Sequence, residues 1–264
     1  MKTIIIAGLP ITIFSSNNYI QEIKELFGNS NKPVSFHGYS LASLYLMKQI
    51  PNLFTMRLAN DYFLCDGRGF YYLMKILGVR GVSKLSLPSL TLQLLTIAGQ
   101  LNKSVFILGA TMESNNKAIQ TIKGKYHIKY IWGRNGYFNE EEEENIVQEI
   151  NYYSPDILLL GMSSPKKDEF VYRWKTRLKV KIIVHCGGMI DIISGKTKMY
   201  PQWIKNLCLA GVYRFLQEPV RLKRDFFNIF PSLFIATKII IIQKVLHRDY
   251  IYSVYDNKDV QQSL

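Results

Sequence analysis

Four short apolar runs, each ended by a glycine-containing turn, constrain the fold of this chain more than any other feature. They cover residues 61–65, 103–108, 156–160 and 181–184, and segments with helical periodicity separate most of them. Strands that are buried on both faces of a parallel sheet read as short, nearly continuous apolar runs. The alternation of such strands with helices predicts an α/β fold with a mainly parallel sheet.

Further elements extend this alternation. Strands are expected at 34–36 and 128–132, and helices at 17–27, 40–50, 90–101 and 114–122. Another helix is expected to begin at Asn139, because the glutamates at 140–144 suit the positive end of a helix dipole. We assign this acidic run to a solvated helix start and not to catalysis.

The first residues resemble a signal peptide only superficially. An apolar run from Ile4 to Phe14 follows Lys2, but Gly8 and Pro10 interrupt it and no small-x-small cleavage site follows. The expectation is a first buried strand at 4–6 that turns at 8–10 into a second short strand.

The turns after the predicted strands form the candidate binding edge. Ligands of parallel sheets bind beyond the carboxyl ends of the strands, and backbone N–H groups there suit phosphates. Neither GxGxxG after the first strand nor GxxxxGK[ST] occurs, which argues against a dinucleotide site and a P-loop. The turns are at 66–67, 109–111, 161–165 and 186–188.

Two acidic residues in these turns each have two interpretations. Asp66 follows an apolar strand, where partial desolvation would raise its pKa toward the range of a general base, but it also suits a turn-forming aspartate. Asp191 follows Gly187 and Gly188, where it would accept hydrogen bonds from ribose hydroxyls or cap the next helix.

The charge of the chain indicates an anionic partner. The net charge is +13, and residues 166–224 contain fourteen basic and four acidic side chains. Some of these lysines suit a solvated face, but Arg214, Arg221 and Arg224 fall on one helical stripe suited to phosphate oxygens. A basic block beside an apolar segment favours an anionic membrane surface over nucleic acid as a partner.

The C-terminal part differs from the rest. Strands end after about residue 194, which divides the chain into an α/β core at 1–195 and a helical appendage at 196–264. The apolar segment 226–246 contains Pro231, Asn228 and Lys238. An amphipathic helix in the lipid interface suits it best, with a buried core helix and a membrane span as the alternatives.

The cysteine and histidine patterns argue against a disulfide framework and against a metal site. Cys65, Cys186 and Cys208 form no CxxC pair and no even disulfide framework, which favours a reducing compartment. The four histidines show no zinc-ligand spacing, so no metal site is expected.

Several motifs in order resemble those of the WecG/TagA/CpsF family, glycosyltransferase family 26, over about residues 4–227. They are Cys65-Asp66-Gly67-Arg68-Gly69-Phe70, Phe106-Ile107-Leu108-Gly109-Ala110, Gly136-Tyr137-Phe138, Gly161-Met162-Ser163-Ser164-Pro165-Lys166, Gly187-Gly188-Met189-Ile190-Asp191 and the segment from Tyr213 to Arg221.

The resemblance implies a Rossmann-like α/β fold with helices on both faces and a C-terminal appendage that closes over the site and touches the membrane. It implies an inverting, metal-independent and cofactor-free enzyme on the cytoplasmic face of the bacterial plasma membrane. Such an enzyme transfers a sugar from a UDP-sugar, for example UDP-N-acetylmannosamine or its uronic acid, to a polyprenyl-diphosphate-linked sugar in cell-surface polysaccharide biosynthesis.

The resemblance also implies roles for individual residues. Asp66 matches the proposed general base, and Arg214, Arg221 and Arg224 match arginines that contact diphosphate. The residues expected to shape the nucleotide pocket are Gly109, Ala110, Gly161, Pro165, Gly187, Gly188 and Asp191.

Departures from the family pattern fall in the expected pocket. Ser35-Phe36-His37 replaces a Thr-x-Asn; His37 then binds the acceptor, serves as an auxiliary base, or is a plain polar pocket residue. Lys167 replaces a glutamine, which would favour an extra negative charge on the donor.

Two other functions remain open from the sequence. A non-catalytic basic α/β module would bind anionic lipid or nucleic acid, although no RNA-binding motif is present. A nucleotide-dependent oxidoreductase is disfavoured by the missing glycine fingerprint. Formation of a homo-oligomer is left open as well.

Overall fold

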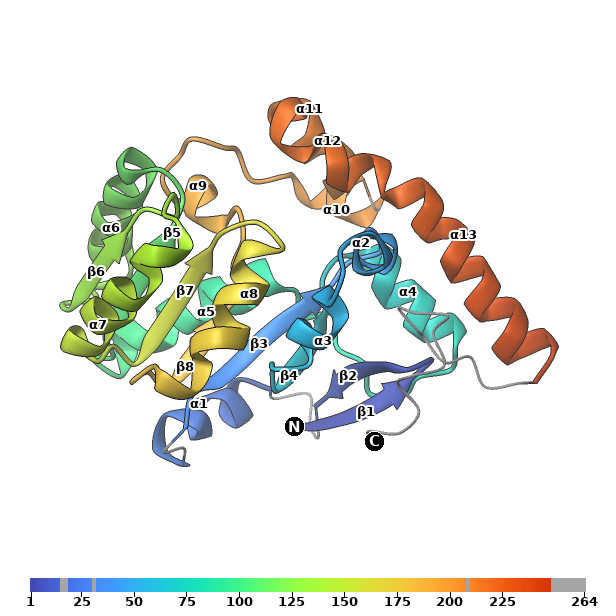
Figure 1. Ribbon diagram of the computed structural model, residues 1–264, viewed down its shortest axis with the longest axis horizontal. Coiled ribbons are helices and arrows are strands. Elements are labelled where there is room, and N and C mark those ends of the chain that lie inside the picture. Colours follow the sequence, from blue (N-terminus) through green and yellow to red (C-terminus); the bar gives the residue numbers. More distant parts are fainter. Residues whose placement is uncertain (15–18, 30–31, 208, 248–264) are drawn as a thin grey trace.

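The protein is built on a six-stranded parallel sheet (Figure 1). The structure, a computed structural model, describes residues 1–14, 19–29, 32–207 and 209–247. The strand order is β4-β3-β8-β7-β5-β6, and every neighbouring pair is parallel. The strands are β3 (Val34–Tyr39), β4 (Tyr62–Cys65), β5 (Val105–Gly109), β6 (Ile131–Arg134), β7 (Ile157–Gly161) and β8 (Ile182–Val184).

Helices cover both faces of this sheet, as the Rossmann-like expectation requires. Ile107 of β5 packs into the core cluster shared with α1, α5, α6 and α9, whereas its neighbour Phe106 packs into the cluster shared with α7 and α8. The first layer contains α1 (Tyr19–Asn29), α5 (Leu87–Gln100), α6 (Met112–Tyr126) and α9 (Met189–Ile193); the second contains α3 (Leu53–Arg57), α7 (Glu143–Tyr153) and α8 (Lys166–Trp174).

The acidic run begins a helix, as predicted. Asn139 and Glu142 form a capping box ahead of a short 3₁₀ turn, Glu140–Glu142, and α7 follows it. Glu143 departs from the solvated interpretation: it is buried and accepts hydrogen bonds from Arg173 and from the indole of Trp174. One carboxylate of the run therefore ties α7 to α8.

The N-terminal hairpin corrects one prediction. β1 (Lys2–Ile6) and β2 (Leu9–Ile13) pair antiparallel in a separate sheet. The expected burial of the first strand is wrong, because Ile5 is 66% exposed while Leu9 and Ile11 of β2 are fully buried. The reason is that β2 lies against β4, where Thr12 Oγ1 accepts a hydrogen bond from the Phe63 amide, so β1 becomes the outer strand.

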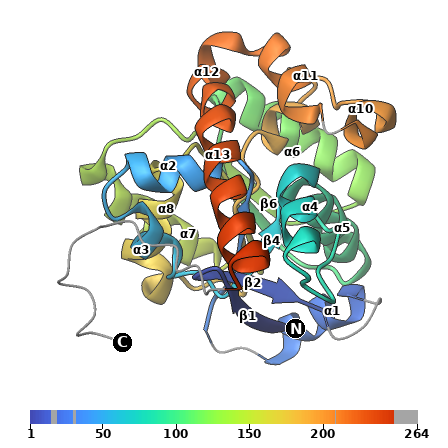
Figure 2. The same cartoon turned by 90° about the vertical axis from the view of Figure 1, so that its right-hand side faces the viewer.

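The C-terminal elements are helices that fold back over the core (Figure 2). Ile235 and Ile239 of the last helix are buried in a cluster with residues of α2 and α4, and Ser232 Oγ accepts a hydrogen bond from the Tyr45 amide. The last helix therefore belongs partly to the core. The C-terminal elements are α10 (Gln202–Asn206), α11 (Ala210–Gln217), α12 (Pro219–Phe227), α13 (Ile229–Ile240) and a π-helical turn (Ile241–Val245). The core helices in this cluster are α2 (Ser43–Gln49) and α4 (Arg68–Ile76).

Contact between β5 and β7 at their carboxyl ends gives a test of the fold. A Cβ on Gly109, whose φ is +153°, would lie 2.4 Å from Gly161 Cα. We expect Gly109→Ala to lower the free energy of unfolding by about 2 kcal/mol or more, as overpacking does. Gly124→Ala is the control, because nothing lies within 4 Å of a Cβ in that helical position; it should be neutral or stabilising by up to about 1 kcal/mol. Urea unfolding measures both, and equal stability of the two variants would contradict the packing described.

Candidate functional site

The turns at the carboxyl ends of four strands contact one another. The Ala110 amide donates to Gly161 O over 3.2 Å, the Gly136 amide donates to Ala110 O over 2.9 Å, and the Gly187 amide donates to Leu160 O over 3.1 Å. The structure therefore brings the glycine-rich residues expected around a nucleotide into one continuous edge. Pro165 and Gly188 stand at the starts of α8 and α9 on the same edge.

An open pocket adjoins these turns. It has a volume of about 380 Å³ and lies between the start of α6 and the chain that follows α9. Thr111, which comes directly after Ala110, caps α6 by accepting a hydrogen bond from the Ser114 amide. The lining of the pocket combines hydroxyl groups with two lysines. The lining residues are Thr111, Glu113, Ser114, Lys117, Ser194, Gly195 and Lys196.

Asp66 lies at the end of β4 on this edge. Its amide donates to Tyr39 O over 2.9 Å, and a Cβ on Gly38 of β3 would lie 2.8 Å from its Cβ, so the glycine leaves the room that the aspartate occupies. Burial raises the pKa of the Asp66 carboxyl above its ordinary value. The charges of Lys167 and Arg214 and a hydrogen bond from the Leu87 amide act in the opposite direction.

The appendage brings a guanidinium toward Asp66. Arg214 of α11 lowers the pKa of Asp66 through its charge, and it does the same to Tyr200 of the preceding loop. Burial, followed by the charge of Asp66, raises the pKa of Tyr200. Arg214 Nε is buried and makes no hydrogen bond with the described residues. Asp66, Tyr200 and Arg214 therefore form one electrostatic group made from both parts of the chain.

Polar contacts fix the appendage over the strand ends. Arg224 Nη2 donates to Ser164 O over 2.9 Å, Arg68 Nη2 donates to Asn206 Oδ1 over 2.9 Å, and Thr197 Oγ1 donates to Glu218 Oε1 over 2.8 Å. Arg224 thus contacts the turn that begins α8. Arg221 belongs to α12, but its side chain lies outside the described residues.

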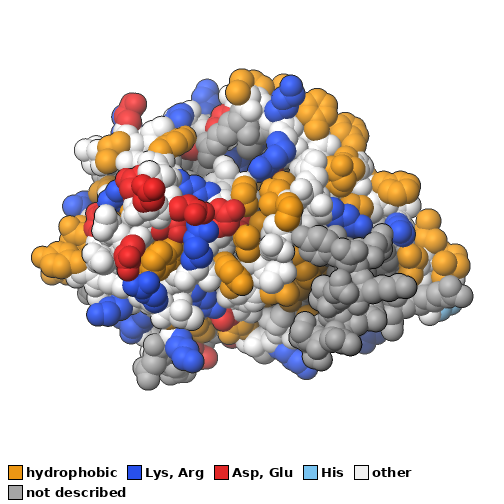
Figure 3. All heavy atoms as spheres, viewed as in Figure 1, with side chains coloured by type: hydrophobic (Ala, Val, Ile, Leu, Met, Phe, Trp, Pro, Cys, Tyr) orange, Lys and Arg blue, Asp and Glu red, His pale blue; other side chains and the backbone are white. Residues whose placement is uncertain are grey.

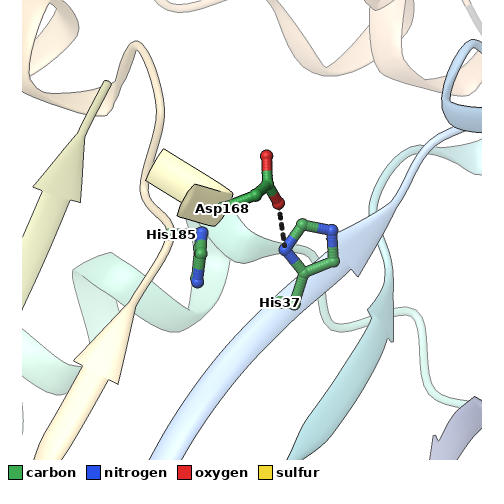
Figure 4. A group of neighbouring side chains, drawn as sticks. All are labelled: His37, Asp168 and His185. Carbon is green, nitrogen blue, oxygen red and sulfur yellow. Dashed lines mark ion pairs between the residues drawn. The ribbon is translucent and has the colours of Figure 1, made fainter. Parts of the chain in front are cut away.

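His37 lies in a buried cluster rather than in the open edge. Its ring is fully buried beside His185, with ring centroids 4.9 Å apart, and its Nδ1 lies 3.6 Å from Asp168 Oδ1 (Figure 4). Arg57 completes the cluster: its Nε donates to Asp168 Oδ1 over 3.3 Å and its Nη2 donates to Ser164 Oγ over 3.2 Å. A role for His37 in contacting the acceptor finds no support in this burial.

The cluster is the one place where the described residues gather potential metal ligands, with ligand atoms of His37, Asp168 and His185 within 4.8 Å of one another. They fit a metal poorly. Asp168 Oδ1 already accepts from Arg57, and a dication there would sit beside a buried guanidinium. Although burial opposes its ionisation, the charges of Arg57 and Lys167 hold the pKa of Asp168 below its ordinary value. The cluster is therefore a charge-compensated polar core.

The two remaining predicted residues are Ser35 and Asp191, and only Asp191 lies near the candidate pocket. Ser35 lies at the amino end of β3, away from the strand ends, and both its amide and its hydroxyl donate to Asp61 Oδ2. The structure therefore gives Ser35 a structural contact and does not bring it to the candidate site. Asp191 is buried on α9, and its Oδ1 lies 3.8 Å from Lys196 Nζ, a lysine of the pocket lining.

Many residues of the basic block turn out to be structural. Lys166 Nζ donates to the carbonyls of Gly136 and Phe138, Arg173 pairs with Glu143, and Lys175 pairs with Asp61. Spacing alone gave no signal for these partners. Arg57 was missed for the same reason, since nothing in the sequence links it to Asp168 on α8.

Protonation of the two buried histidines should govern acid stability. Burial lowers the pKa of His37 well below 6.5 and the pKa of His185 to about 3. Below pH 6.5 the unfolded chain binds protons that the folded protein does not, so stability falls as pH falls, by about 1.4 kcal/mol per pH unit for each histidine. We expect His37→Gln to roughly halve this slope between pH 5 and 6, measured by urea unfolding. An unchanged slope in His37→Gln would contradict the assignment.

Known proteins similar to this chain act on a lipid-linked sugar according to their names. N-acetylglucosaminyldiphosphoundecaprenol N-acetyl-beta-D-mannosaminyltransferase of Bacillus subtilis (strain 168) is 24% identical over 167 residues, which are 63% of this chain and 64% of that protein. The protein of the same name from Staphylococcus aureus (strain MRSA252) is 28% identical over 130 residues, which are 49% and 51% of the two chains. The chain thus spans less than two thirds of the length of these relatives.

The family comparison covers more of the chain and includes the appendage. The match to the Glycosyl transferase WecG/TagA/CpsF family extends over residues 4–246, from the first strand to the end of the helix that packs on α2. With the α/β core, the glycine-rich edge and the folded-back helices all inside this match, the chain belongs to the Glycosyl transferase WecG/TagA/CpsF family.

Proposed function

We propose that this protein is an inverting glycosyltransferase that moves a sugar from a UDP-sugar to a polyprenyl-diphosphate-linked sugar. The observation that carries the proposal is the position of Asp66, a partly buried carboxyl group held at the carboxyl edge of the sheet by the hydrogen bond from its amide to Tyr39 O. Burial raises its pKa, and the charges of Lys167 and Arg214 act in the opposite direction. A partly buried carboxylate suits proton removal from an acceptor hydroxyl, and the cations suit two diphosphates.

The donor nucleotide is assigned to the glycine-rich half of the edge. The turns at Ala110, Gly161 and Gly187 contact one another there, and the pocket beside Thr111 offers Lys117 and Lys196. Backbone N–H groups at a helix start and lysines are the groups that bind phosphate oxygens. Asp191, beside Lys196, is the candidate acceptor for ribose hydroxyls.

The proposed step is a single displacement. Asp66 takes the proton of the acceptor hydroxyl, whose oxygen forms the new bond to the anomeric carbon. The bond from that carbon to the UDP oxygen breaks on the opposite face, and UDP leaves with the electron pair. One negative charge thereby passes from Asp66 to the leaving diphosphate, and in this proposal Arg214 and Arg224 stabilise it there. Arg214 acts on Asp66 through its charge, and Arg224 contacts the turn that begins α8, which supports this assignment. These cationic side chains supply this stabilisation, and we propose no metal or cofactor.

The named relatives support a donor sugar of the N-acetylmannosamine type and an acceptor of the diphosphoundecaprenol type. The product would then serve the synthesis of a bacterial cell-surface polysaccharide.

The appendage supports peripheral binding to the cytoplasmic face of the plasma membrane. The helix Lys223–Val245 is long and apolar enough to cross a membrane, but Ile235 and Ile239 on one side pack into the core. On the other side, Phe230 is 61% and Phe234 is 75% exposed, and hydrophobic side chains gather over α12 and α13 (Figure 3). A helix with one face docked and the other apolar and exposed suits the lipid interface.

Replacing the proposed base tests the function. Asp66→Asn keeps the size of the side chain and removes its basicity, so transfer should fall by about 10²–10⁴-fold, with the thermal unfolding midpoint little changed. The measurement is UDP release from UDP-N-acetylmannosamine with a detergent-solubilised polyprenyl-diphosphate sugar. Full turnover in Asp66→Asn would remove this residue from the base role. No UDP release by the unmodified protein, from this or related UDP-sugars, would favour a non-catalytic anion-binding module.

The exposed face of the last helix gives a second test. Deleting the segment from Phe226 would also expose the core around Ile235, so point changes are the cleaner test. Phe230→Gln combined with Phe234→Gln should release the protein from anionic vesicles in a sedimentation assay, because burial of two phenylalanines is lost, worth about 2 kcal/mol each. Tyr152→Gln is the control, being 83% exposed on α7. Vesicle binding that is unchanged in the double variant would contradict the lipid contact.

A further inference from the structure

Asn115 joins the start of α6 to the ends of two strands. Its side chain is fully buried, and its Nδ2 donates to Gly109 O over 2.9 Å, to Arg134 O over 2.9 Å and to Ile107 O over 3.2 Å. Its backbone amide also donates to Thr111 O over 2.8 Å. One asparagine therefore holds the turn after β5 on both sides and fixes it to the carboxyl ends of β5 and β6.

The turn that Asn115 holds has a backbone conformation that needs support. Ala110 has a φ of +57°, in the left-handed region that is unfavourable for a residue with a Cβ. Such a conformation persists only where the surrounding contacts enforce it. Backbone hydrogen bonds with Gly136 and Gly161 supply part of this support. Asn115 supplies further hydrogen bonds on both sides of Ala110.

These contacts determine where the amides of the turn point. The peptide bonds of the turn are trans, so each N–H points away from the carbonyl of the preceding residue. Because protein amides hold the carbonyls of Ala110 and Thr111, the N–H groups of Thr111 and Met112 face away from those contacts. Neither N–H group makes a hydrogen bond with a described residue. Thr111 also lines the pocket to which we assign the donor nucleotide, and free amides at a helix start suit phosphate oxygens.

We propose that Asn115 is a positioning residue for the donor nucleotide, which holds the turn at Gly109 and Ala110 in the conformation that receives the diphosphate. This inference rests on the proposed function for the identity of the ligand, whereas its structural part concerns the turn alone. Asn115 is buried and is not among the residues that line the pocket, so it acts through the turn. Gly133 of β6 agrees with this role, because a Cβ there would lie 2.2 Å from Asn115 Oδ1 and the glycine leaves that space to the amide.

Transfer kinetics of the full-length protein test this role. In Asn115→Ala, which removes the side-chain donors, we expect the KM for the UDP-sugar to rise about tenfold, because the apparent affinity falls with the fraction of molecules that keep the turn in its binding conformation. The kcat at saturating donor and the KM for the lipid-linked acceptor should stay close to those of the unmodified protein, because bound donor restores the turn. Asn116→Ala is the control, since this neighbouring asparagine of α6 is exposed, and it should leave all three constants unchanged.

A purely structural role of Asn115 would give a different result. Partial unfolding lowers the apparent kcat through the loss of active protein and leaves the KM for the UDP-sugar as it is. That result, or a KM in Asn115→Ala equal to that in Asn116→Ala, would overturn the inference. If Asn115→Ala does not fold, Asn115→Ser takes its place in all measurements, because serine keeps one donor.

Amide hydrogen exchange reports on the turn without any turnover. The Gly136 amide donates to Ala110 O over 2.9 Å. It should exchange about tenfold faster in Asn115→Ala than in Asn116→Ala, because local opening of the turn becomes more populated. Faster exchange in a protein that transfers no sugar would support the role of Asn115 in the turn and refute the proposed function. Unchanged exchange in a protein that transfers sugar would overturn the inference and leave the proposed function standing, so the two failures are distinguishable.

Discussion

The candidate site depends on a balance between the burial of one carboxyl group and the positive charges that surround it. Burial raises the pKa of Asp66, and Lys167 and Arg214 lower it. Neither influence alone would suit the proposed base, because a fully solvated aspartate binds protons too weakly and a buried one without cations stays protonated. The parallel sheet makes the balance possible because it brings the end of β4 and the start of α8 to the same edge. Gly38 contributes by leaving space for the aspartate.

The appendage links this balance to the surface of the molecule. Arg224 contacts the turn at Ser164, and Ser164 in turn contacts Arg57 of the buried cluster. The same group of helices places Arg214 toward Asp66 and exposes Phe230 and Phe234 on α13. A chain segment that docks on the core, contributes a charge beside Asp66 and offers an apolar surface suits the proposed reaction between a nucleotide sugar and a lipid-linked acceptor.

The parts of the fold that follow from local pattern were predictable from the sequence. The buried runs became β4, β5, β7 and β8, because strands of a parallel sheet must be apolar on both faces, and the turns after them met at one edge. The helix after Asn139 followed from its capping residues. The family resemblance added the expectation that the appendage folds back, which spacing alone does not contain.

The remaining features depend on contacts between residues that are distant in the sequence. His37, Arg57, Asp168 and His185 have no recognisable spacing, and only the packing of α3 and α8 against β3 joins them. The interpretation of Ser35 as a pocket residue did not include its hydrogen bond to Asp61. This bond lies at the amino end of β3, whereas the candidate site lies at the carboxyl ends of the strands. The burial of β1 was predicted from its apolar residues, but which strand of a hairpin faces the core is decided by the neighbour it packs on.

Hydrogen exchange of the full-length protein with and without a UDP-sugar tests most directly whether both parts of the chain form one site. The account predicts slower exchange at the Ala110 and Gly187 turns and in α11, because the nucleotide contacts the first two and the diphosphate engages Arg214. Protection confined to other regions, or no change at the turns and in α11 under saturating UDP-sugar, would contradict it.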